Sequence, residues 1–370
     1  MKFIRVIISG GGTGGHIFPA ISIANAVKAK CPDAEILFVG AEGRMEMERV
    51  PAAGYKIIGL PVRGFDRSNL LKNFKILWLL FKSLFKARRI VKDFNPDVAV
   101  GVGGYASGPM LRAAASMGIP TLIQEQNSYA GVTNKLLAAK ASRICVAYPE
   151  MERFFPKEKI LLTGNPVRQD LSEGENLKQL AIESFGLNPD KKTLLIVGGS
   201  LGARTINESV MAFIDELEKA EDLQVIWQTG KYYYKNILER LEGKQLKNVK
   251  VLQFVNKMNQ AYAIADLVIS RAGASSISEF CLLKKPVILI PSPNVAEDHQ
   301  TKNAMALVKK DAAIIVRDAE AREMLIPAAL KLINEPEKLE KMSENIYNLA
   351  QIDSAARIAD EILNLVHLKN

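Results

Sequence analysis

The chain has 370 residues and a mass of 40.7 kDa, more than one hydrophobic core usually supports, so we expect two domains. Hydrophobic residues make up 48% and charged residues 24%, the balance of a soluble globular chain, which excludes an intrinsically disordered one. No apolar run approaches the roughly 18 residues that span a bilayer, and three scattered cysteines favour a reducing compartment over disulfides or a zinc site.

The net charge of +9 is unevenly distributed along the chain. Residues 1–165 hold 23 basic and 12 acidic residues, a balance of +11, whereas residues 166–370 hold 26 and 28, a balance of −2. A nucleic acid, an anionic membrane surface or a phosphorylated ligand would each explain this asymmetry.

The N-terminal half alternates strands with helices. Phe3–Ser9 is a predicted first strand that ends in a glycine loop, Gly10–Gly15, and an amphipathic helix follows over Ile17–Lys30. Further strands are predicted at Glu35–Val39, Asp97–Gly101 and Ile119–Gln124. This alternation favours a parallel sheet covered by helices on both faces.

Between these strands, residues 70–92 form a basic amphipathic segment. Its apolar residues recur at helical spacing and include Trp78, Phe81 and Phe85, and its only charges are seven Lys and Arg residues, among them Lys82 and Lys86. This composition is typical of a helix at a membrane interface. A helix that packs on the sheet with a solvated basic face is the alternative.

The strand pattern then starts again, with Leu194–Val197 leading into a second glycine loop about 188 residues after the first. The later strands are predicted at Leu223–Gln228, Val249–Phe254, Leu267–Ser270 and Pro286–Ile290. We therefore expect an α/β fold of two Rossmann-like domains, with a proline-containing linker over residues 155–192. A last helix over about residues 355–368 could pack on either domain.

The first glycine loop, Gly10–Gly15, is the first candidate site. It satisfies the dinucleotide pattern G-x-G-x-x-G, but the acidic residue expected about 20 positions later is present only as Glu42, late and inside another loop. His16 comes directly after the loop, where a helix start disfavours the charged imidazolium, so His16 is a candidate general base. A capping or packing histidine is the alternative.

Other polar segments follow predicted strands. In the N-terminal half these are residues 103–109 and the amide-rich run 124–127; because amides and a carboxylate are poor core material, we expect the latter to bind hydroxyl groups. In the C-terminal half, Ser200 lies in the second glycine loop, and residues 274–279 open a helix whose start suits a phosphate. Glu279 suits a ribose diol, or is an ordinary exposed helix residue. Arg168 lies beside the linker and suits a phosphate.

Taken in order, the segments GGGTGGHIFPA, GVGGYASGP, QEQNSYAGVTNKLLA, TGNPVR, GGSLGAR and RAGASSISE followed by DHQTKNA resemble the MurG-type glycosyltransferases of peptidoglycan synthesis. The resemblance covers nearly the whole chain. It implies a glycosyltransferase-B fold with two Rossmann-like domains facing across a cleft. The implied domains are residues 1–163 for the acceptor and membrane, residues 164–350 for the UDP-sugar, and a C-terminal helix over residues 351–370.

The resemblance also implies the reaction. N-acetylglucosamine would pass from its UDP donor to the C4 hydroxyl of N-acetylmuramic acid in lipid I, with inversion, to give lipid II. Lipid I is undecaprenyl-pyrophosphoryl-MurNAc-pentapeptide, which the enzyme would meet as a peripheral protein on the cytoplasmic side of the cell membrane. No Asp-x-Asp motif occurs, and no metal, cofactor or nucleic acid is expected.

Site residues are carried over by motif. Thr13, Gly14 and Gly15 would contact the donor, with Asn127 near its sugar. Arg168 and Ser200 would hold the diphosphate region, and Val255 the uracil. The run Ala274, Ser275, Ser276, Ile277, Ser278 and Glu279 would hold pyrophosphate and ribose, and Gln300 would hold the sugar hydroxyls, although some relatives have a second glutamine where this chain has Thr301. His16 is the predicted base, with Glu125 in reserve.

Three alternatives remain open from the sequence. One is another UDP-sugar enzyme of the same fold, such as a glycolipid transferase or a UDP-GlcNAc epimerase. Another is an NAD-dependent oxidoreductase, against which the second glycine loop and the missing ribose acid argue. The third is a non-catalytic membrane-binding module, which the density of polar sites disfavours.

Overall fold

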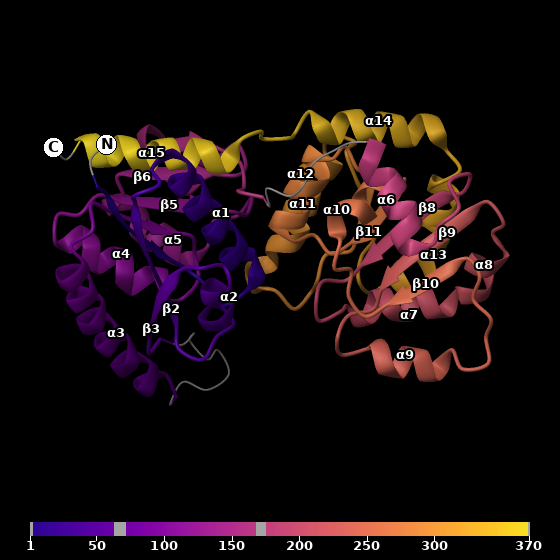
Figure 1. Ribbon diagram of the computed structural model, residues 1–370, viewed down its shortest axis with the longest axis horizontal. Coiled ribbons are helices and arrows are strands. Elements are labelled where there is room, and N and C mark those ends of the chain that lie inside the picture. The colour runs from indigo at the N-terminus through magenta and orange to yellow at the C-terminus, as the bar shows by residue number, and fades with distance from the viewer. Residues whose placement is uncertain (1–2, 63–71, 168–174, 369–370) are drawn as a thin grey trace. The chain divides into compact units, whose positions relative to one another are not determined.

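The structure, a computed structural model, describes residues 3–62, 72–167 and 175–368. The chain divides into two compact units: unit 1 comprises residues 1–168 and 351–370, and unit 2 comprises residues 169–350 (Figure 1).

Unit 1 is built on a parallel sheet. Its strands are β1 (Arg5–Ser9), β2 (Glu35–Ala41), β3 (Lys56–Leu60), β4 (Val98–Gly101), β5 (Thr121–Glu125), β6 (Arg143–Val146) and β7 (Ile160–Leu162). They lie in the order β3-β2-β1-β4-β5-β6-β7. Ser9 at the end of β1 pairs in register with Val39 and with Gly101, so neighbouring strands end at one edge and deliver their loops together.

Helices cover both faces of this sheet. They are α1 (Gly14–Lys30), α2 (Glu46–Ala52), α3 (Lys72–Phe94), α4 (Ser107–Ser116), α5 (Val132–Leu137) and α15 (Ser354–Leu368). Alternate residues of β1 point into two separate cores: Val6 and Ile8 pack with α1 and α15, whereas Ile7 packs with α3 and α4. This period-two pattern is that of a strand buried on both sides.

Unit 2 repeats the architecture. Its strands are β8 (Lys192–Val197), β9 (Leu223–Gln228), β10 (Val249–Leu252), β11 (Leu267–Ser270), β12 (Val287–Leu289) and β13 (Ile314–Ile315), all parallel in the order β10-β9-β8-β11-β12-β13. Its helices are α6 (Glu175–Phe185), α7 (Arg204–Ala212), α8 (Ile214–Lys219), α9 (Tyr234–Arg240), α10 (Met258–Ile264), α11 (Ala274–Leu282), α12 (His299–Val308), α13 (Ala321–Leu332) and α14 (Pro336–Tyr347). The two parallel α/β domains expected from the sequence are confirmed.

The last helix belongs to unit 1. Figure 1 shows α15 beside α1, and its residues Ile358, Ala359 and Ile362 are buried in the core shared with that helix. Arg357 Nη2 donates to the carbonyl oxygen of Leu162 at 2.6 Å, which ties α15 to the edge strand β7.

The sequence prediction of a linker between the two sheets needs correction. Residues 155–192 were expected to be a linker, but β7 and α6 lie within them, β7 as the edge strand of the first sheet. The first unit, expected over residues 1–163, extends to residue 168 in the structure. The reason is that Asn165 is buried in a hydrogen-bond network with Gln124 and Gln126, and the carbonyl oxygen of Val167 accepts a bond from Ser22 Oγ at 3.2 Å.

Candidate functional site

The first glycine loop leads from β1 into the start of α1. Thr13 is the residue before the helix, with extended backbone angles, and its carbonyl oxygen accepts the N–H groups of His16 at 3.1 Å and Ile17 at 3.2 Å. Gly14 and Gly15 form the first turn of α1, where N–H groups have no partner within the helix. This end of α1 therefore carries a partial positive charge that suits an anionic ligand.

His16 is half-buried, and its ring orientation is set by the loop. Its Nδ1 lies 3.0 Å from the carbonyl oxygen of Gly11 and 3.3 Å from Thr13 Oγ1. Because a carbonyl oxygen only accepts, the neutral ring must carry its proton on Nδ1, which makes Nε2 the basic nitrogen. This is the tautomer that a general base at Nε2 requires.

The loop at Gly103 and Gly104, which follows β4, packs directly on the first glycine loop. A Cβ on Gly103 would lie 2.8 Å from His16 Nε2, and a Cβ on Gly104 would lie 2.4 Å from the carbonyl oxygen of Gly11. Both glycines also have left-handed φ angles, +94° and +84°. The structure thus brings together the two N-terminal glycine motifs, and only glycine allows so close an approach.

Glu125, the last residue of β5, is enclosed by the turn that follows it. Its carboxylate accepts bonds from the backbone N–H groups of Asn127 and Gly131, both at 3.0 Å, and from the Asn134 and Asn127 amides at 2.8 and 3.3 Å. The residue is 1% exposed, and burial raises the pKa of its carboxyl group despite these donors. Asn127 is thereby fixed in a half-buried position at the carboxyl edge of the sheet.

The neighbouring amides were expected to bind hydroxyl groups, and the structure corrects this. Gln124 and Gln126 are buried, at 0% and 2% exposure, and bond to each other, to Asn165 and to the carbonyl oxygen of Val102. Polar side chains are tolerated in the core here because their hydrogen bonds are satisfied internally.

In unit 2, the buried Gln228 connects the loop that carries Ser200 to Val255, two of the predicted ligand contacts. Gln228 Nε2 donates to the carbonyl oxygen of Gly199 at 3.0 Å, and its Oε1 accepts the N–H of Val255 at 2.8 Å. The loop that carries exposed Ser200 is therefore fixed next to Val255. Val255 as a whole is 2% exposed, so it offers a base little surface in this structure.

The start of α11 is a second helix end that suits an anionic ligand. Gly273 precedes the helix in extended conformation, no side chain caps it, and Ser275 and Ser276 are half-buried in its first turn. Ser275 Oγ is buried and has no hydrogen-bond partner among the described residues. Ala274 and Ile277 pack in the core, and Ser278 Oγ donates back to the Ala274 carbonyl oxygen at 3.1 Å, so these three offer a ligand mainly backbone groups.

Glu279 is not the exposed helix residue that was the alternative from the sequence. It is 8% exposed, and its Oε2 accepts a hydrogen bond from the Tyr262 hydroxyl at 2.9 Å. Tyr262 lies on α10, so the carboxylate is held between two helices. Its orientation is fixed before any ligand binds.

Gln300 lies in the first turn of α12, after two residues with left-handed φ angles, Glu297 at +56° and Asp298 at +51°. Its Oε1 accepts the N–H of Ser292, which follows β12, at 2.8 Å. Because the amide oxygen of Gln300 faces Ser292, its amide nitrogen, which is the donor of this side chain, points away from Ser292. Thr301 Oγ1 instead bonds Asp298 Oδ1 at 2.7 Å, which favours Gln300 over Thr301 as the sugar contact.

Arg168 lies outside the described residues. Sequence reasoning missed three residues that position the site: Glu46, which bonds the first glycine loop, Gln228 and Tyr262. Their partners are backbone groups or distant side chains, so no local spacing in the sequence marks them.

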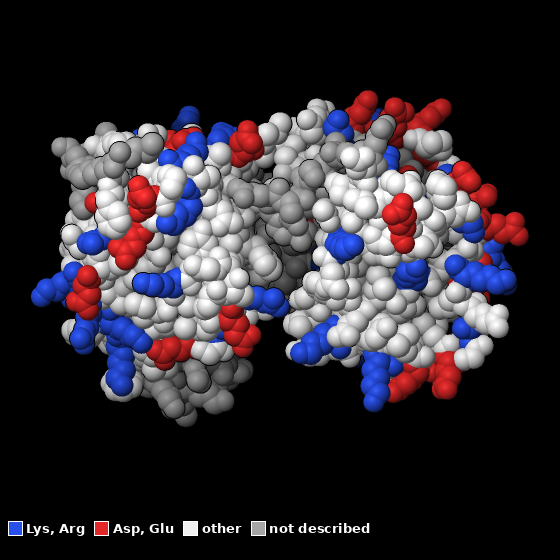
Figure 2. Space-filling model, in the orientation of Figure 1, with Lys and Arg blue, Asp and Glu red and all other residues white. Residues whose placement is uncertain are grey.

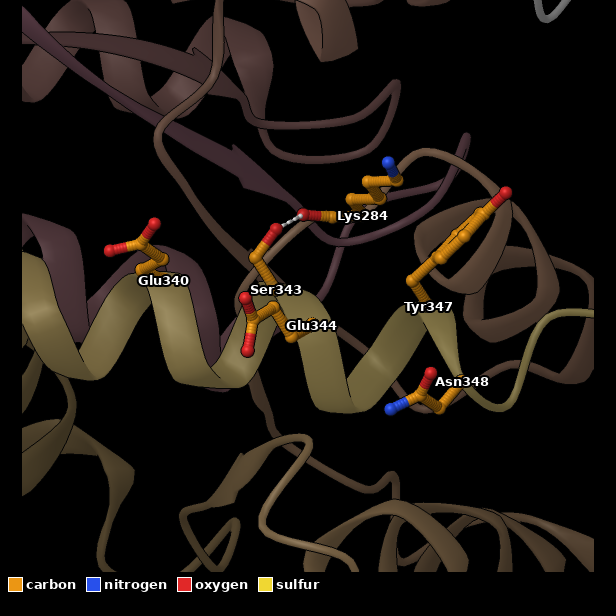
Figure 3. Close-up of a pocket in the computed structure, with 6 residues that line it drawn as sticks. All are labelled: Lys284, Glu340, Ser343, Glu344, Tyr347 and Asn348. Carbon is orange, nitrogen blue, oxygen red and sulfur yellow. Dashed lines mark hydrogen bonds between the residues drawn. The ribbon is translucent and has the colours of Figure 1, made fainter.

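The hollow in Figure 3 is a different feature. It measures about 520 Å³ and lies between α14 and Lys284, beyond the C-terminal end of α11. Ser343 Oγ donates to the Lys284 carbonyl oxygen there at 2.6 Å. The phosphate contacts predicted on α11 lie at its opposite end, and none of the predicted site residues lines this hollow.

The helix α3 has one packed and one exposed face. Ser83, Ala87, Ile90 and Val91 are buried toward α4. The aromatic face, which consists of Trp78, Phe81 and Phe85, is 56%, 62% and 70% exposed. Figure 2 shows Lys and Arg side chains gathered over the part of unit 1 where α3 lies. No helix in the described ranges combines the length and apolar character needed to cross a bilayer.

Two parallel-sheet domains, each with a glycine loop and a helix start at the carboxyl edge, have the architecture of the glycosyltransferase-B fold. The family profile described as "Glycosyltransferase family 28 N-terminal domain" matches residues 6–146, and "Glycosyltransferase family 28 C-terminal domain" matches residues 193–362. The chain belongs to glycosyltransferase family 28.

Similar proteins extend over the full length of the chain. A Parabacteroides distasonis protein is 63% identical over 369 residues, covering 100% of both chains, and a Bacteroides fragilis protein is 64% identical over 363 residues, covering 98% of this chain and 96% of that one. Both are named "UDP-N-acetylglucosamine--N-acetylmuramyl-(pentapeptide) pyrophosphoryl-undecaprenol N-acetylglucosamine transferase".

Solved structures also match nearly the whole chain. The crystal structure of Acinetobacter baumannii MurG is 29% identical, with a TM-score of 0.77 over 98% of this chain and 99% of that one. A Neisseria meningitidis UDP-GlcNAc 2-epimerase bound to UDP-GlcNAc is 16% identical, with a TM-score of 0.68 over 100% of both chains. At that identity the epimerase shares the fold alone.

Proposed function

We propose that this glycosyltransferase moves N-acetylglucosamine from UDP-N-acetylglucosamine to the C4 hydroxyl of N-acetylmuramic acid in lipid I, forming lipid II. The observation that carries this is the full-length 63% identity to a protein whose name states that transfer. The distribution of anion-binding features between the two units supports it.

Unit 2 is the proposed donor side. The α11 start, with Ser275 and Ser276, and the loop at Ser200 would hold the diphosphate, because uncapped helix N–H groups and small hydroxyls suit phosphate oxygens. Glu279 would accept the ribose hydroxyls, Val255 would meet the uracil, and the Gln300 amide would donate to the sugar. Arg168 remains a predicted diphosphate contact.

Unit 1 is the proposed acceptor side, with the base at His16. The C4 hydroxyl of the acceptor would attack the anomeric carbon of N-acetylglucosamine while the bond from that carbon to UDP breaks. His16 Nε2 would take the hydroxyl proton, because its Nδ1 already donates to the Gly11 carbonyl. Thr13, Gly14 and Gly15 would contact the donor from the start of α1.

Glu125 has a different role in this proposal. Four hydrogen bonds and 1% exposure engage its carboxylate in ordering residues 127–134. We therefore assign Glu125 the task of positioning Asn127 near the sugar and give the proton transfer to His16.

The aromatic face of α3 is the proposed membrane contact. Because the lipid acceptor resides in the bilayer, the enzyme must reach the membrane surface. Exposed Trp78, Phe81 and Phe85 with Lys82 and Lys86 on the same helix combine apolar insertion with attraction to anionic lipid. The protein would then be peripheral on the cytoplasmic side of the cell membrane.

The deciding experiment is incubation with UDP-N-acetylglucosamine and a lipid I analogue, following UDP release and the disaccharide product. We expect both, in equal amounts; UDP release without the disaccharide would contradict the acceptor assignment. Hydrogen exchange with and without UDP tests the donor side separately. Protection should fall at Ser200, Val255 and residues 274–279, and protection confined to residues 1–150 would contradict it.

A further inference from the structure

The first glycine loop holds a buried carboxylate that the proposed reaction does not use. Glu46 is the first residue of α2 and is 1% exposed. Its Oε2 accepts the N–H of Gly12 and its Oε1 accepts the N–H of Ala41, both at 2.9 Å. One side chain thus joins the first glycine loop to the end of the neighbouring strand β2.

The backbone around Glu46 is shaped to receive it. A Cβ on Gly11 would lie 2.2 Å from Glu46 Oε1, and a Cβ on Gly40 would lie 2.5 Å from Glu46 Cγ. Gly11 and Gly12 have φ angles of +149° and +89°, which other residues rarely adopt. The loop conformation and the carboxylate therefore depend on each other.

The same loop conformation directs His16. The Gly11 carbonyl oxygen, one residue before the N–H that Glu46 accepts, lies 3.0 Å from His16 Nδ1. Any rotation of the Gly11–Gly12 peptide that releases Glu46 also turns this carbonyl away from the imidazole, since the carbonyl of Gly11 and the N–H of Gly12 belong to one rigid peptide plane.

We propose that Glu46 is a positioning residue for His16. Its carboxylate fixes the Gly11–Gly12 peptide so that the Gly11 carbonyl oxygen accepts a hydrogen bond from Nδ1–H and Nε2 is the basic nitrogen. This rests on the proposed role of His16 as the base. A carboxylate suits the task because both of its partners are donors; a glutamine would turn an NH₂ group toward one of two N–H groups.

The test compares Glu46→Gln with Glu48→Gln, an exposed glutamate on the same helix. We expect Glu46→Gln to lower kcat by about tenfold or more, less than loss of the base itself, with affinity for UDP unchanged within about twofold. Glu48→Gln should match the wild type in both.

A purely structural role of Glu46 would not change which ring nitrogen of His16 carries the proton. This protonation site is therefore the measurement that decides between the two roles. The chain has three histidines, so nitrogen NMR of the imidazoles can be assigned with His16→Ala and His367→Ala. We expect neutral His16 to carry its proton on Nδ1 in the wild type and to become a mixture of tautomers in Glu46→Gln. Unchanged His16 signals in Glu46→Gln would overturn the proposal, whatever happens to turnover.

Should Glu46→Gln not fold, Glu46→Asp provides the same test. It keeps the two acceptor oxygens, but its side chain is one methylene shorter and cannot reach both N–H groups in the same way. Its His16 tautomers should also mix, and an unaltered Nδ1–H tautomer would overturn the proposal. If His16→Ala retains turnover, the assignment of the base fails, while the NMR comparison still tests whether Glu46 sets the tautomer.

Discussion

The Tyr262 hydroxyl donates a hydrogen bond to Glu279 Oε2 at 2.9 Å, and both side chains are buried. Glu279→Ala should therefore do more than weaken UDP binding. Loss of the carboxylate leaves the Tyr262 hydroxyl buried without this acceptor, so the free energy of unfolding should fall by about 1–3 kcal/mol. Urea denaturation and UDP titration measure the two effects.

The matched variant Glu279→Gln separates stability from binding. Its amide oxygen can still accept from Tyr262, so stability should stay close to that of the wild type. Its affinity for UDP should fall, because the amide presents one acceptor where a ribose diol needs two. Wild-type affinity in Glu279→Gln would remove Glu279 from the donor site.

His16→Ala should lower turnover by about 10²–10⁴-fold, the usual contribution of a general base. UDP binding should be unchanged, because the proposed donor site lies in unit 2. His367→Ala, an exposed histidine on α15, serves as the control and should retain full activity. Turnover of His16→Ala within a few-fold of the wild type would make another group the base.

The aromatic face of α3 predicts binding to anionic vesicles that weakens with salt, since each basic residue near such a surface contributes about 1 kcal/mol. Replacing Trp78 and Phe81 by Ser, and Lys82 and Lys86 by Glu, should abolish vesicle binding in a flotation assay while UDP still binds.

A control variant carries the same change in charge in unit 2. It replaces Leu238 and Met324 by Ser, and Lys235 and Lys247 by Glu; all four residues are exposed. This variant should bind vesicles like the wild type. Equal loss in both variants would show that net charge alone attracts the protein, and unchanged binding of the α3 variant would make α3 only a packed helix.

Ser83 is a buried position at which we expect a substitution to maintain or raise stability. Its hydroxyl is buried on the side of α3 that packs toward α4, and it has no hydrogen-bond partner among the described residues. Ser83→Ala removes the unpaired group and improves helix propensity, so we expect the free energy of unfolding to stay the same or rise by about 1 kcal/mol. Thermal unfolding would reveal this; a loss of more than about 1 kcal/mol would mean that the hydroxyl is bonded in solution.

Glu125 predicts a dependence of stability on pH. Burial raises the pKa of its carboxyl group, so the folded state holds this proton more tightly than the unfolded state. Its contribution to stability is therefore fully present below the unfolded pKa and is lost as the pH rises through the raised, folded pKa. Relative to Glu125→Gln, the wild type should lose stability over this range in urea titrations; a parallel pH dependence would contradict the shift.

The sequence predicted the longer apolar strands closely and missed the shortest edge strands. Leu223–Gln228 and Leu267–Ser270 match β9 and β11, because buried parallel strands are continuous apolar runs. The edge strands β7 and β13 have three and two residues, all half-buried, and such short runs carry no clear period. This is why a linker was predicted where β7 lies.

For the site, the sequence located the loops but not what holds them. Glycine motifs are visible because backbone approach demands glycine, as at Gly103 beside His16. Gln228 was not predicted, because its partners at Gly199 and Val255 are backbone groups that only the parallel register brings within reach. Burial likewise cannot be read from polarity, which is why Gln124 and Gln126 were expected to face a ligand.

The placement of α15 has a consequence for the order in which the protein forms on the ribosome. Unit 2 is continuous in sequence, so its core can close as soon as residue 350 has left the exit tunnel. Unit 1 is translated first, but its core around α1 is complete only when Ile358, Ile362 and Val366 have been added. We therefore expect unit 1, which carries the first glycine loop and His16, to be the last to become native although it is the first to be translated.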